Sequence, residues 1–212
     1  MHELLPETVM SKPWIAPALR SAVRAGVELG ERLLLGPLGV VFAADVSAPR
    51  YPYVRESVVV RNWARLEEMP KPHQGPRRSS VAYIGAISPL RGSTVTLDAL
   101  RILWGRGLKV GVDCIGPGAV ADLEALRDAG RESGFDVRVP GAVGANEVLS
   151  LIKDCVAGLS VLMPTGNYND TIPTKVCEYM ALELPIIVSD FPILRNLIAS
   201  AQCWTTVDPR SP

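Results

Sequence analysis

The 212-residue chain has no net charge, few aromatic residues and no long apolar run. Its 22 basic and 22 acidic side chains cancel, so the broad positive surface of a nucleic-acid-binding protein is not expected. No apolar run approaches the ~20 residues that span a bilayer. The first residues also lack the basic and apolar regions of a signal peptide. We therefore expect a cytoplasmic protein without a nucleic-acid partner.

Several motifs that carry catalytic chemistry are also missing. The four cysteines form no Cys-x-x-Cys pair and fall in or beside apolar runs, which predicts buried, reduced thiols: Cys114, Cys155, Cys177 and Cys203. No Asp-x-Asp is present, so a metal-bound diphosphate is not indicated. The absence of Gly-x-x-x-x-Gly-Lys-Ser/Thr argues against a P-loop NTPase. No Gly-x-Ser-x-Gly indicates a serine hydrolase.

From Ser80 onward, apolar strands alternate with helical stretches. Strands are expected at 81–87, 108–115, 135–139, 156–163, 185–188 and 202–207. Helices are expected near 93–104, 119–132, 145–154, 174–182 and 192–199. This alternation predicts an α/β domain with a Rossmann-like parallel sheet and helices on both faces.

The residues before Ser80 form two further parts. Residues 14–35 carry a helical apolar stripe, and residues 40–44 and 57–61 read as short strands. The stretch 64–79 is rich in proline and glycine and is predicted to be a linker. The expected organisation is therefore a first part at 1–63, a linker at 64–79 and the α/β domain at 80–212.

The most informative stretch surrounds two acids, Asp170 and Glu178, separated by seven residues. Pro173 and Thr174 indicate a helix start between them, so Asp170 precedes the helix and Glu178 lies about one turn inside it. A helix N-terminus offers free N–H groups to a diphosphate. Lys175 stands in the first helical turn, where a cation is unfavourable unless an anion is bound. The layout suits a nucleotide-sugar.

A second polar loop follows the first strand of the α/β domain. It runs from Gly85 to Gly92 and contains Arg91 just before a predicted helix. A cation at that place is disfavoured by ~0.3–1 kcal/mol. An arginine can instead make a planar, bidentate contact with phosphate. We therefore interpret Arg91 as a phosphate ligand.

A third loop matches the dinucleotide fingerprint Gly-x-Gly-x-x-Ala at Gly116, Gly118 and Ala121. A nicotinamide enzyme needs an acid about 20 residues further on, at the end of the next strand. Asp136 has this spacing, but it stands at the start of its strand. The loop also follows the second strand of the domain instead of the first. We therefore favour a packing role for these glycines.

The stretch 170–192 resembles the retaining glycosyltransferases of the GT-B fold, the large family 4 also known as glycosyl transferases group 1. Their donor-binding motif has two glutamates separated by seven residues. Asp170, a shorter acid, stands at the first position, and Glu178 matches the second. The segments Glu-Tyr-Met-Ala and Pro-Ile-Ile-Val-Ser-Asp are similar to the variant of this motif found in surface-polysaccharide enzymes.

Three positions depart from the family pattern. Glu183 occupies a place where the family usually has glycine, which would supply a left-handed helix end without strain. Ala86 stands near the place of a usual arginine, and Arg91 takes a lysine position. His2 resembles a histidine of the family's N-terminal domain that lies near the donor sugar.

The resemblance implies transfer of a hexose, with retention, from a nucleoside-diphosphate sugar to a saccharide or lipid-linked acceptor. No metal or other cofactor is expected. Asp170 would hold sugar hydroxyls, Glu178 the ribose, and Arg91 and Lys175 would stabilise the departing diphosphate. The implied phosphate-binding positions are Gly85, Arg91, Thr174 and Lys175.

The resemblance also implies that residues 1–63 are a remnant of the acceptor domain. We therefore expect a complementing N-terminal domain and peripheral membrane association among the partners, and weak or no transfer by this chain alone. Two alternatives stay open. One is a non-catalytic module that binds a nucleotide-sugar or a partner. The other is a GT-B epimerase acting on UDP-sugars.

Overall fold

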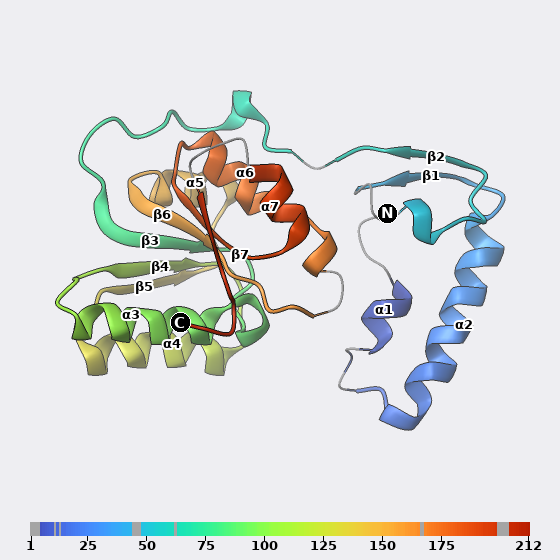
Figure 1. The fold of residues 1–212 in the computed structure, drawn as a ribbon, viewed down its shortest axis with the longest axis horizontal. Helices are drawn as coiled ribbons and strands as arrows, with labels where there is room; N and C mark the ends of the chain where they lie inside the picture. The colour runs from blue at the N-terminus through green and yellow to red at the C-terminus, as the bar shows by residue number, and fades with distance from the viewer. Residues whose placement is uncertain are drawn as a thin grey trace. The chain divides into compact units, whose positions relative to one another are not determined.

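The computed structural model describes residues 5–10, 12, 14–43, 48–61, 63–165, 168–198 and 204–212 (Figure 1). The chain divides into two compact units. The first comprises residues 1–62 and 165–172, and the second comprises residues 63–164 and 173–212. No helix in the described ranges is both long enough and apolar enough to cross a membrane.

The second unit is built on a six-stranded parallel sheet with the strand order β5-β4-β3-β6-β7-β8. Its strands are β3 (Arg78–Ile84), β4 (Gly111–Ile115), β5 (Val137–Gly141), β6 (Cys155–Ser160), β7 (Ile186–Ser189) and β8 (Trp204–Val207). The direction of strand addition reverses between β3 and β6. In such sheets, ligands bind outside the carboxyl ends of the strands at this switch point.

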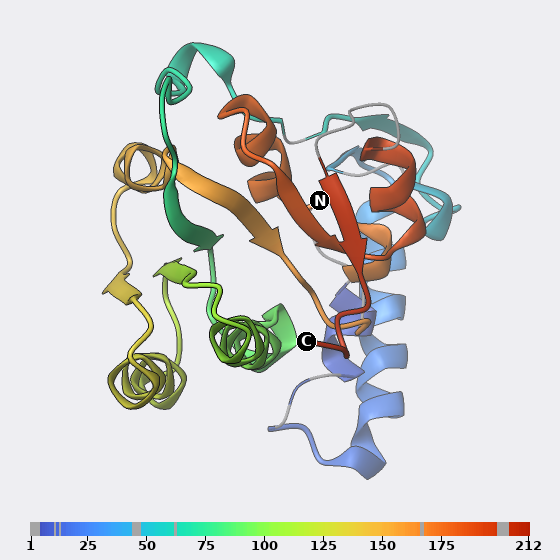
Figure 2. The same cartoon turned by 60° about the vertical axis from the view of Figure 1, so that its left-hand side comes forward.

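Helices cover both faces of this sheet, which confirms the predicted Rossmann-like fold. The helices are α3 (Ser93–Gly105), α4 (Val120–Ser133), α5 (Ala145–Ile152), α6 (Thr174–Ala181) and α7 (Pro192–Ile198). Helices α3 and α4 lie on one face, and α5 and α6 lie on the other (Figure 2). This arrangement follows from right-handed crossovers that run outward from β3 in both directions. The core beneath α3 and α4 includes Leu97, Leu100, Val112 and Leu126.

Tyr179 of α6 is inserted where β3 and β6 begin to separate. Its hydroxyl accepts a hydrogen bond from the Ile84 N–H at 3.2 Å and lies 3.1 Å from the Ala82 carbonyl oxygen and 3.3 Å from that of Leu159. The ring occupies space that only glycine leaves open, since a Cβ at Gly158 would lie 2.4 Å from ring atoms. A buried phenol therefore replaces ladder bonds and anchors α6 at the switch point.

We expect Tyr179→Phe to reduce the free energy of unfolding by ~1–3 kcal/mol, because it leaves buried main-chain groups without a partner. Urea unfolding should show the loss as a lower midpoint with an unchanged slope. The comparison is Tyr83→Phe, since the Tyr83 hydroxyl bonds only within the loop after its own strand, to the Ala86 carbonyl oxygen at 3.4 Å and to the Ser88 main chain. Equal effects of the two substitutions would contradict the anchoring role of Tyr179.

A buried charge cluster lies toward the amino ends of the same strands, and the sequence reading missed it. Asp113 on β4 is 1% exposed, and Arg78 at the start of β3 donates to it at 2.7 Å. Arg78 also binds Asp154 at 2.8 Å, and this hydrogen bond lowers the pKa of the Asp154 carboxyl. Removing one partner of such a buried pair is costly. The cluster therefore holds β3, β4 and the α5–β6 connection together.

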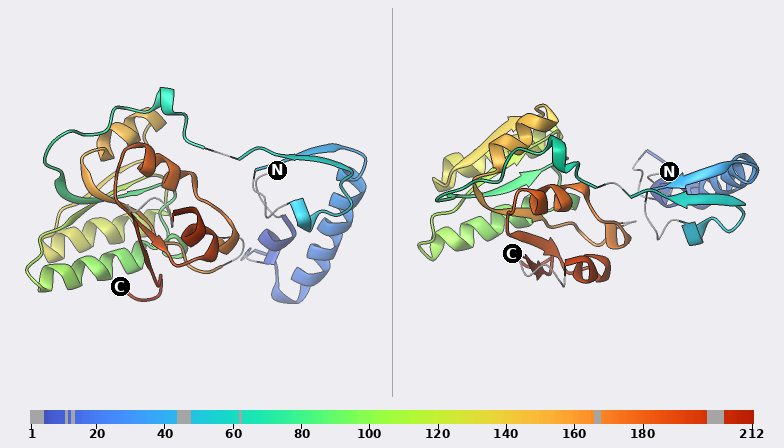
Figure 3. Two further views of the ribbon diagram at one scale, coloured as in Figure 1. Left: turned by 45° about the horizontal axis from the view of Figure 1, so that its top comes forward. Right: turned by 90° about the horizontal axis from the view of Figure 1, so that it is seen from above.

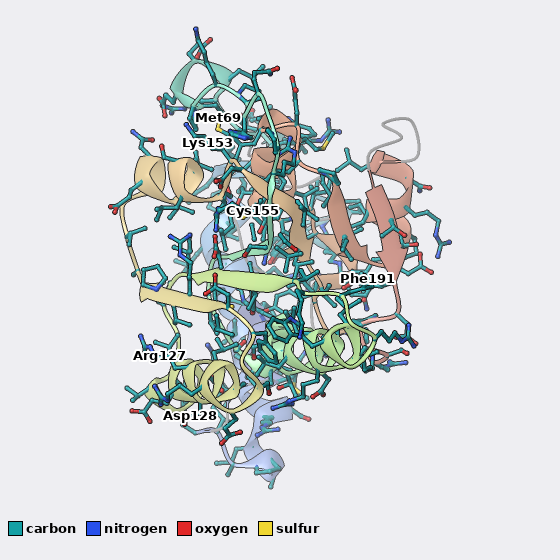
Figure 4. The ribbon with its side chains drawn as sticks, turned by 90° about the vertical axis from the view of Figure 1, so that its left-hand side faces the viewer. Met69, Arg127, Asp128, Lys153, Cys155 and Phe191 are labelled. Carbon is teal, nitrogen blue, oxygen red and sulfur yellow. The ribbon has the colours of Figure 1, made fainter. Side chains whose placement is uncertain are left out.

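The thiols behave as the sequence predicts within the described chain. Cys114, Cys155 and Cys177 are free and buried, whereas Cys203 lies outside the described residues. Cys155 is the first residue of β6, and its thiol is buried. The Asp128 side chain is instead exposed, and it points away from the sheet on the outer side of α4 (Figure 4). Burial is the main cause that raises the pKa of the Cys155 thiol to about 12. The thiol is therefore protonated and inert near neutral pH.

The first unit contains α1 (Leu5–Met10), α2 (Pro17–Leu35), and a two-stranded parallel sheet of β1 (Gly39–Phe42) and β2 (Glu56–Val59). Helix α1 lies against α2 (Figure 3). Between the strands, a 3-10 helix η1 (Ala48–Arg50) leads to Tyr51, which packs on Val40 and Phe42. A cavity of about 810 Å³ lies beside α2.

Candidate functional site

The candidate site lies in the second unit, beyond the carboxyl ends of β3 and β6. The loop after β3 passes Gly85, with φ of 94°, and enters a 3-10 helix η3 (Pro89–Arg91). The Met163 N–H, in the segment after β6, donates to the Leu90 carbonyl oxygen at 3.0 Å. The two loops that follow the switch-point strands are therefore directly joined.

Gly92 makes this close approach possible. Its φ is 89°, and a Cβ at this position would lie 2.1 Å from the Val161 carbonyl oxygen. Gly92 is also the residue before α3, and no side chain caps this helix. Arg91 is thus held between the end of β3 and the start of α3, on a backbone that only glycine permits at the next position.

Lys175, the second residue of α6, is the most unusual group of the site. The residue is only 6% exposed, yet its Nζ has no hydrogen-bond partner. Nζ lies 4.9 Å from the centre of the Tyr83 ring. Burial is the main cause that lowers the pKa of Lys175 to about 7, and the positive charge of Arg91 lowers it further. The two positive charges therefore disfavour each other, and an anion bound near Lys175 would favour its charged form.

Lys175 lies in the first turn of α6. The helix starts at the exposed Thr174 and follows Pro173, which has no side chain able to cap it. The first N–H groups of a helix have no intrahelical partner. Glu178 lies one turn further along and is partly buried; burial raises the pKa of its carboxyl, and Lys175 opposes this shift. The second unit thus brings Gly85, Arg91, Thr174, Lys175 and Glu178 to one edge of the sheet.

The position of the Asp170 side chain relative to these residues is not described. Asp170 ends a 3-10 helix η4 (Tyr168–Asp170), which groups with the first unit, and its side chain is outside the described part. His2 also lies outside the described residues. Roles for both side chains stay predictions.

The two glycines of the dinucleotide-like fingerprint serve loop packing. A Cβ at Gly116 would lie 2.1 Å from the Gly85 carbonyl oxygen, and one at Gly118 would lie 3.0 Å from that of Ile87. The loop after β4 therefore presses directly on the loop after β3, which supports the packing interpretation. It also fixes the backbone that leads to Arg91.

Glu183 has the left-handed conformation that the sequence comparison predicted for a glycine. Its φ is 56°, and it has the only positive φ among the described residues other than glycine. The helix end is therefore formed despite the side chain, at the expense of local strain. The Arg77 guanidinium donates to the Glu183 carbonyl oxygen at 3.1 Å and helps to hold this turn.

Sequence reasoning missed two supporting residues. The Tyr83 ring packs against the buried Lys175 ammonium. The sequence signal for this role was a tyrosine two positions before Gly85 in an apolar strand. Ser189, at the end of β7, accepts from the Leu162 N–H at 2.6 Å and donates to the Leu162 carbonyl oxygen at 2.7 Å. These two hydrogen bonds to the main chain hold the segment after β6 in place. No local sequence pattern predicts them.

The doubly wound parallel sheet, with a buried lysine and an uncapped helix N-terminus beyond its switch point, places the chain among the Rossmann-like α/β domains. The family model described as "Glycosyl transferases group 1" matches residues 78–212. The chain therefore belongs to the group 1 glycosyl transferases. No curated protein matches it in sequence.

Solved structures of GT-B glycosyltransferases share the fold. Sucrose-phosphate synthase from Thermosynechococcus elongatus is 14% identical with a TM-score of 0.67, over 99% of this chain and 54% of that protein. HepE from Anabaena, solved with UDP and glucose, is 14% identical with a TM-score of 0.65, over 92% of this chain and 56% of HepE. The chain thus spans about half the length of these proteins.

A shorter structure shows the same likeness over one domain. The C-terminal domain of the group 1 glycosyl transferase LpcC from Francisella tularensis is 14% identical with a TM-score of 0.53. The match covers 70% of this chain and 81% of that domain. At these identities the likeness concerns the fold.

Proposed function

We propose that this chain is the donor-binding half of a retaining, family 4 glycosyltransferase. The observation that carries the proposal is the buried, unpartnered Lys175 ammonium, which shares the edge of the sheet with Arg91 and the α6 N-terminus. A buried cation without a partner is expensive, so a bound anion is its natural complement. The structures of HepE with UDP and UDP-glucose favour a nucleoside diphosphate as that anion.

Each site residue then has a distinct role. The diphosphate would lie at Gly85, Arg91, Thr174 and Lys175, while Glu178 would bind the ribose hydroxyls. Asp170, in the loop before α6, would hold hydroxyls of the donor sugar. The sugar would pass, with retention, to a hydroxyl of a saccharide or lipid-linked acceptor, without a metal.

Catalysis would be mainly electrostatic. Departure of the nucleoside diphosphate leaves negative charge on its terminal phosphate. Arg91, Lys175 and the N–H groups of α6 would stabilise this charge without reorganisation. The acceptor must be presented by another part of the protein, and loss of that proximity can raise the barrier by ~7–11 kcal/mol. We therefore expect weak or no transfer by this chain alone.

A non-catalytic nucleotide-sugar-binding module is the second candidate. It is favoured by the strained Glu183 turn, next to the donor-binding helix, and by the short acid at Asp170. This module would bind the donor with the same groups but would neither transfer nor hydrolyse the sugar. Release of glucose from bound UDP-glucose separates the two candidates.

Calorimetric titration with uridine, UDP and UDP-glucose tests donor binding, with GDP and ADP to identify the base. We expect UDP to bind at least about tenfold more tightly than uridine, because the diphosphate makes charge-assisted contacts. Arg91→Ala should weaken UDP binding by ~1–3 kcal/mol and leave uridine binding unchanged. Glu178→Gln should weaken both ligands, since both carry the ribose.

The matched control is Arg101→Ala, which also removes one positive charge. Arg101 is on the exposed side of α3, where it pairs with Asp98 at 2.7 Å. If all nucleoside diphosphates bound no more tightly than their nucleosides, the proposed phosphate site would be wrong. The same conclusion would follow if Arg101→Ala and Arg91→Ala weakened UDP binding equally.

A further inference from the structure

Arg77, the residue before β3, binds three main-chain carbonyl groups. Its guanidinium donates to the Lys153 carbonyl oxygen at 3.0 Å, to that of Cys155 at 3.2 Å and to that of Glu183 at 3.1 Å. Lys153 follows α5, and Cys155 is the first residue of β6 (Figure 4). The planar fork of an arginine can serve several acceptors at once, and its charge suits the negative ends of helices. One side chain therefore joins the carboxyl ends of α5 and α6.

The turn that Arg77 binds at the end of α6 is strained. The Leu184 N–H donates to the Tyr179 carbonyl oxygen at 3.0 Å, and the Glu183 N–H donates to that of Met180 at 3.0 Å. These are the two hydrogen bonds of a Schellman motif, which places its third-last residue pair around a left-handed position normally filled by glycine. Glu183 holds that position with a φ of 56°, so its side chain makes the turn unfavourable by itself. The contact from Arg77 opposes relaxation of this turn.

The depth of Lys175 depends on where α6 lies. No hydrogen bond holds its Nζ, although the residue is only 6% exposed. Its contact with the Tyr83 ring, at 4.9 Å from the ring centre, has no directional bond to fix it. The other charged or titratable groups that face it are Arg91, Glu178 and Cys114. The place of the ammonium is therefore set by the helix that carries it.

Two contacts fix α6 along its length. Tyr179 anchors the helix at the switch point through main-chain groups of β3 and β6. Lys175 and Glu183 each lie four residues from Tyr179, on opposite sides of it. Helices in packed folds shift as rigid bodies, so a pivot about Tyr179 would move the two ends in opposite directions. A second anchor at the Glu183 end thus determines how deep the Lys175 end lies.

We propose that Arg77 is a positioning residue for the donor site. By holding the strained Glu183 turn, it keeps α6 at the depth at which the Lys175 ammonium meets a bound phosphate. Arg77 lies before the start of β3, at the edge of the sheet opposite the candidate site, so it touches no ligand itself. It supplies the stability that a glycine at position 183 would give without strain. The part that concerns phosphate rests on the proposed function, whereas the depth of Lys175 can be measured without a ligand.

The test compares the wild-type chain with Arg77→Met. NMR titration of the lysine Cε signals of the ligand-free chain, with Lys175→Met to assign the signal, measures the pKa of Lys175. In Arg77→Met this pKa should rise from about 7 toward that of an exposed lysine, because the shifted ammonium gains water. Calorimetry with UDP should show binding weakened at least about threefold. Arg77→Lys keeps the charge but loses the fork, and should change both quantities less in the same directions.

The control is Arg127→Met. Arg127 on α4 also donates to a main-chain carbonyl oxygen, that of Val139 at 3.1 Å, and lies on the other side of the sheet (Figure 4). This variant should leave the pKa of Lys175 and the affinity for UDP unchanged. The rescue variant is Glu183→Gly, because glycine adopts the turn without strain. In that background Arg77→Met should change the affinity for UDP less than about 1.5-fold.

Two results would overturn the proposal. The first is an unchanged pKa of Lys175 in Arg77→Met, or in Arg77→Lys where Arg77→Met does not fold. The second is an equal effect of Arg77→Met with and without Glu183→Gly, which would make Arg77 a general stabilising contact. A chain that binds no UDP, but in which Arg77→Met raises the pKa of Lys175 and Glu183→Gly restores it, would contradict the proposed function and support the positioning of Lys175 by Arg77.

Discussion

Replacement of Lys175 by methionine should abolish diphosphate binding and make the ligand-free chain more stable at pH 7 and below. Methionine keeps an unbranched apolar stem against Tyr83 and removes an ammonium that has no hydrogen-bond partner. The gain in the free energy of unfolding should be a few kcal/mol, ~5 at most, because the pKa falls from 10.5 to about 7 and one pKa unit corresponds to about 1.4 kcal/mol. Urea unfolding across a pH series measures the gain.

The direction of the pH dependence follows from the two pKa values of Lys175. Its pKa is about 7 in the folded chain and 10.5 without the fold. Below pH 7 both states carry the proton, so the wild-type chain bears the full penalty of the buried charge. Between these values the unfolded state binds more protons, so wild-type stability rises with pH. The advantage of Lys175→Met should therefore be greatest at low pH and disappear near the upper pKa.

Ligand binding should show the reverse linkage. A bound diphosphate favours the charged ammonium, so binding above about pH 7 should take up a proton, and affinity should fall as the pH rises. Calorimetry of UDP-glucose in two buffers with different ionisation enthalpies measures this uptake. The control is Lys71→Met, which removes an exposed lysine. A pH-independent stability gain of Lys175→Met, or a wild-type affinity for UDP-glucose that does not fall above pH 7, would contradict this account.

The second large effect is expected for Gly92→Ala, which should reduce the free energy of unfolding by roughly 2–5 kcal/mol. Two costs combine at this position. An alanine at a φ of 89° is strained by ~1–2 kcal/mol. Its Cβ would also lie 2.1 Å from the Val161 carbonyl oxygen, and such overpacking adds ~1–3 kcal/mol. The Val161 carbonyl oxygen is a main-chain atom, so it cannot move away by a side-chain rotation.

Gly85→Ala separates the two costs. Gly85 has a similar φ of 94°, but its Cβ position has no atom within 4 Å. This variant should therefore lose only the conformational part, ~1–2 kcal/mol. Urea unfolding of both variants gives the comparison. If the two substitutions were equally destabilising, the close approach of the loops after β3 and β6 would not contribute to stability.

Local sequence signals predicted the helices better than the strands. The expected helix at 93–104 is Ser93–Gly105, and the one at 119–132 is Val120–Ser133, because apolar periodicity and glycine ends act within a few residues. The strand expected at 156–163 instead ends at Ser160. The apolar run continues to Met163, but the main chain of Leu162 bonds to the Ser189 side chain in place of a neighbouring strand.

The candidate site shows the same division. The spacing from Thr174 to Glu178 and the position of Arg91 before a helix could be read from the sequence. The burial of Lys175 could not be predicted, because it depends on Tyr83, which is 92 positions earlier in the sequence. A hydropathy pattern does not report which long-range neighbour covers a charged side chain.

By itself, the sequence determined that the chain from Ser80 onward forms an alternating α/β domain, since this feature rests on local periodicity and on glycine and proline at fixed spacings. Only the tertiary structure decided the pairing of Arg78 with Asp113, the place of Tyr179 between two strands, and the burial of Glu31 on α2. Each of these depends on groups far apart in the sequence. Their energies arise only once packing excludes water, and no local pattern encodes that event.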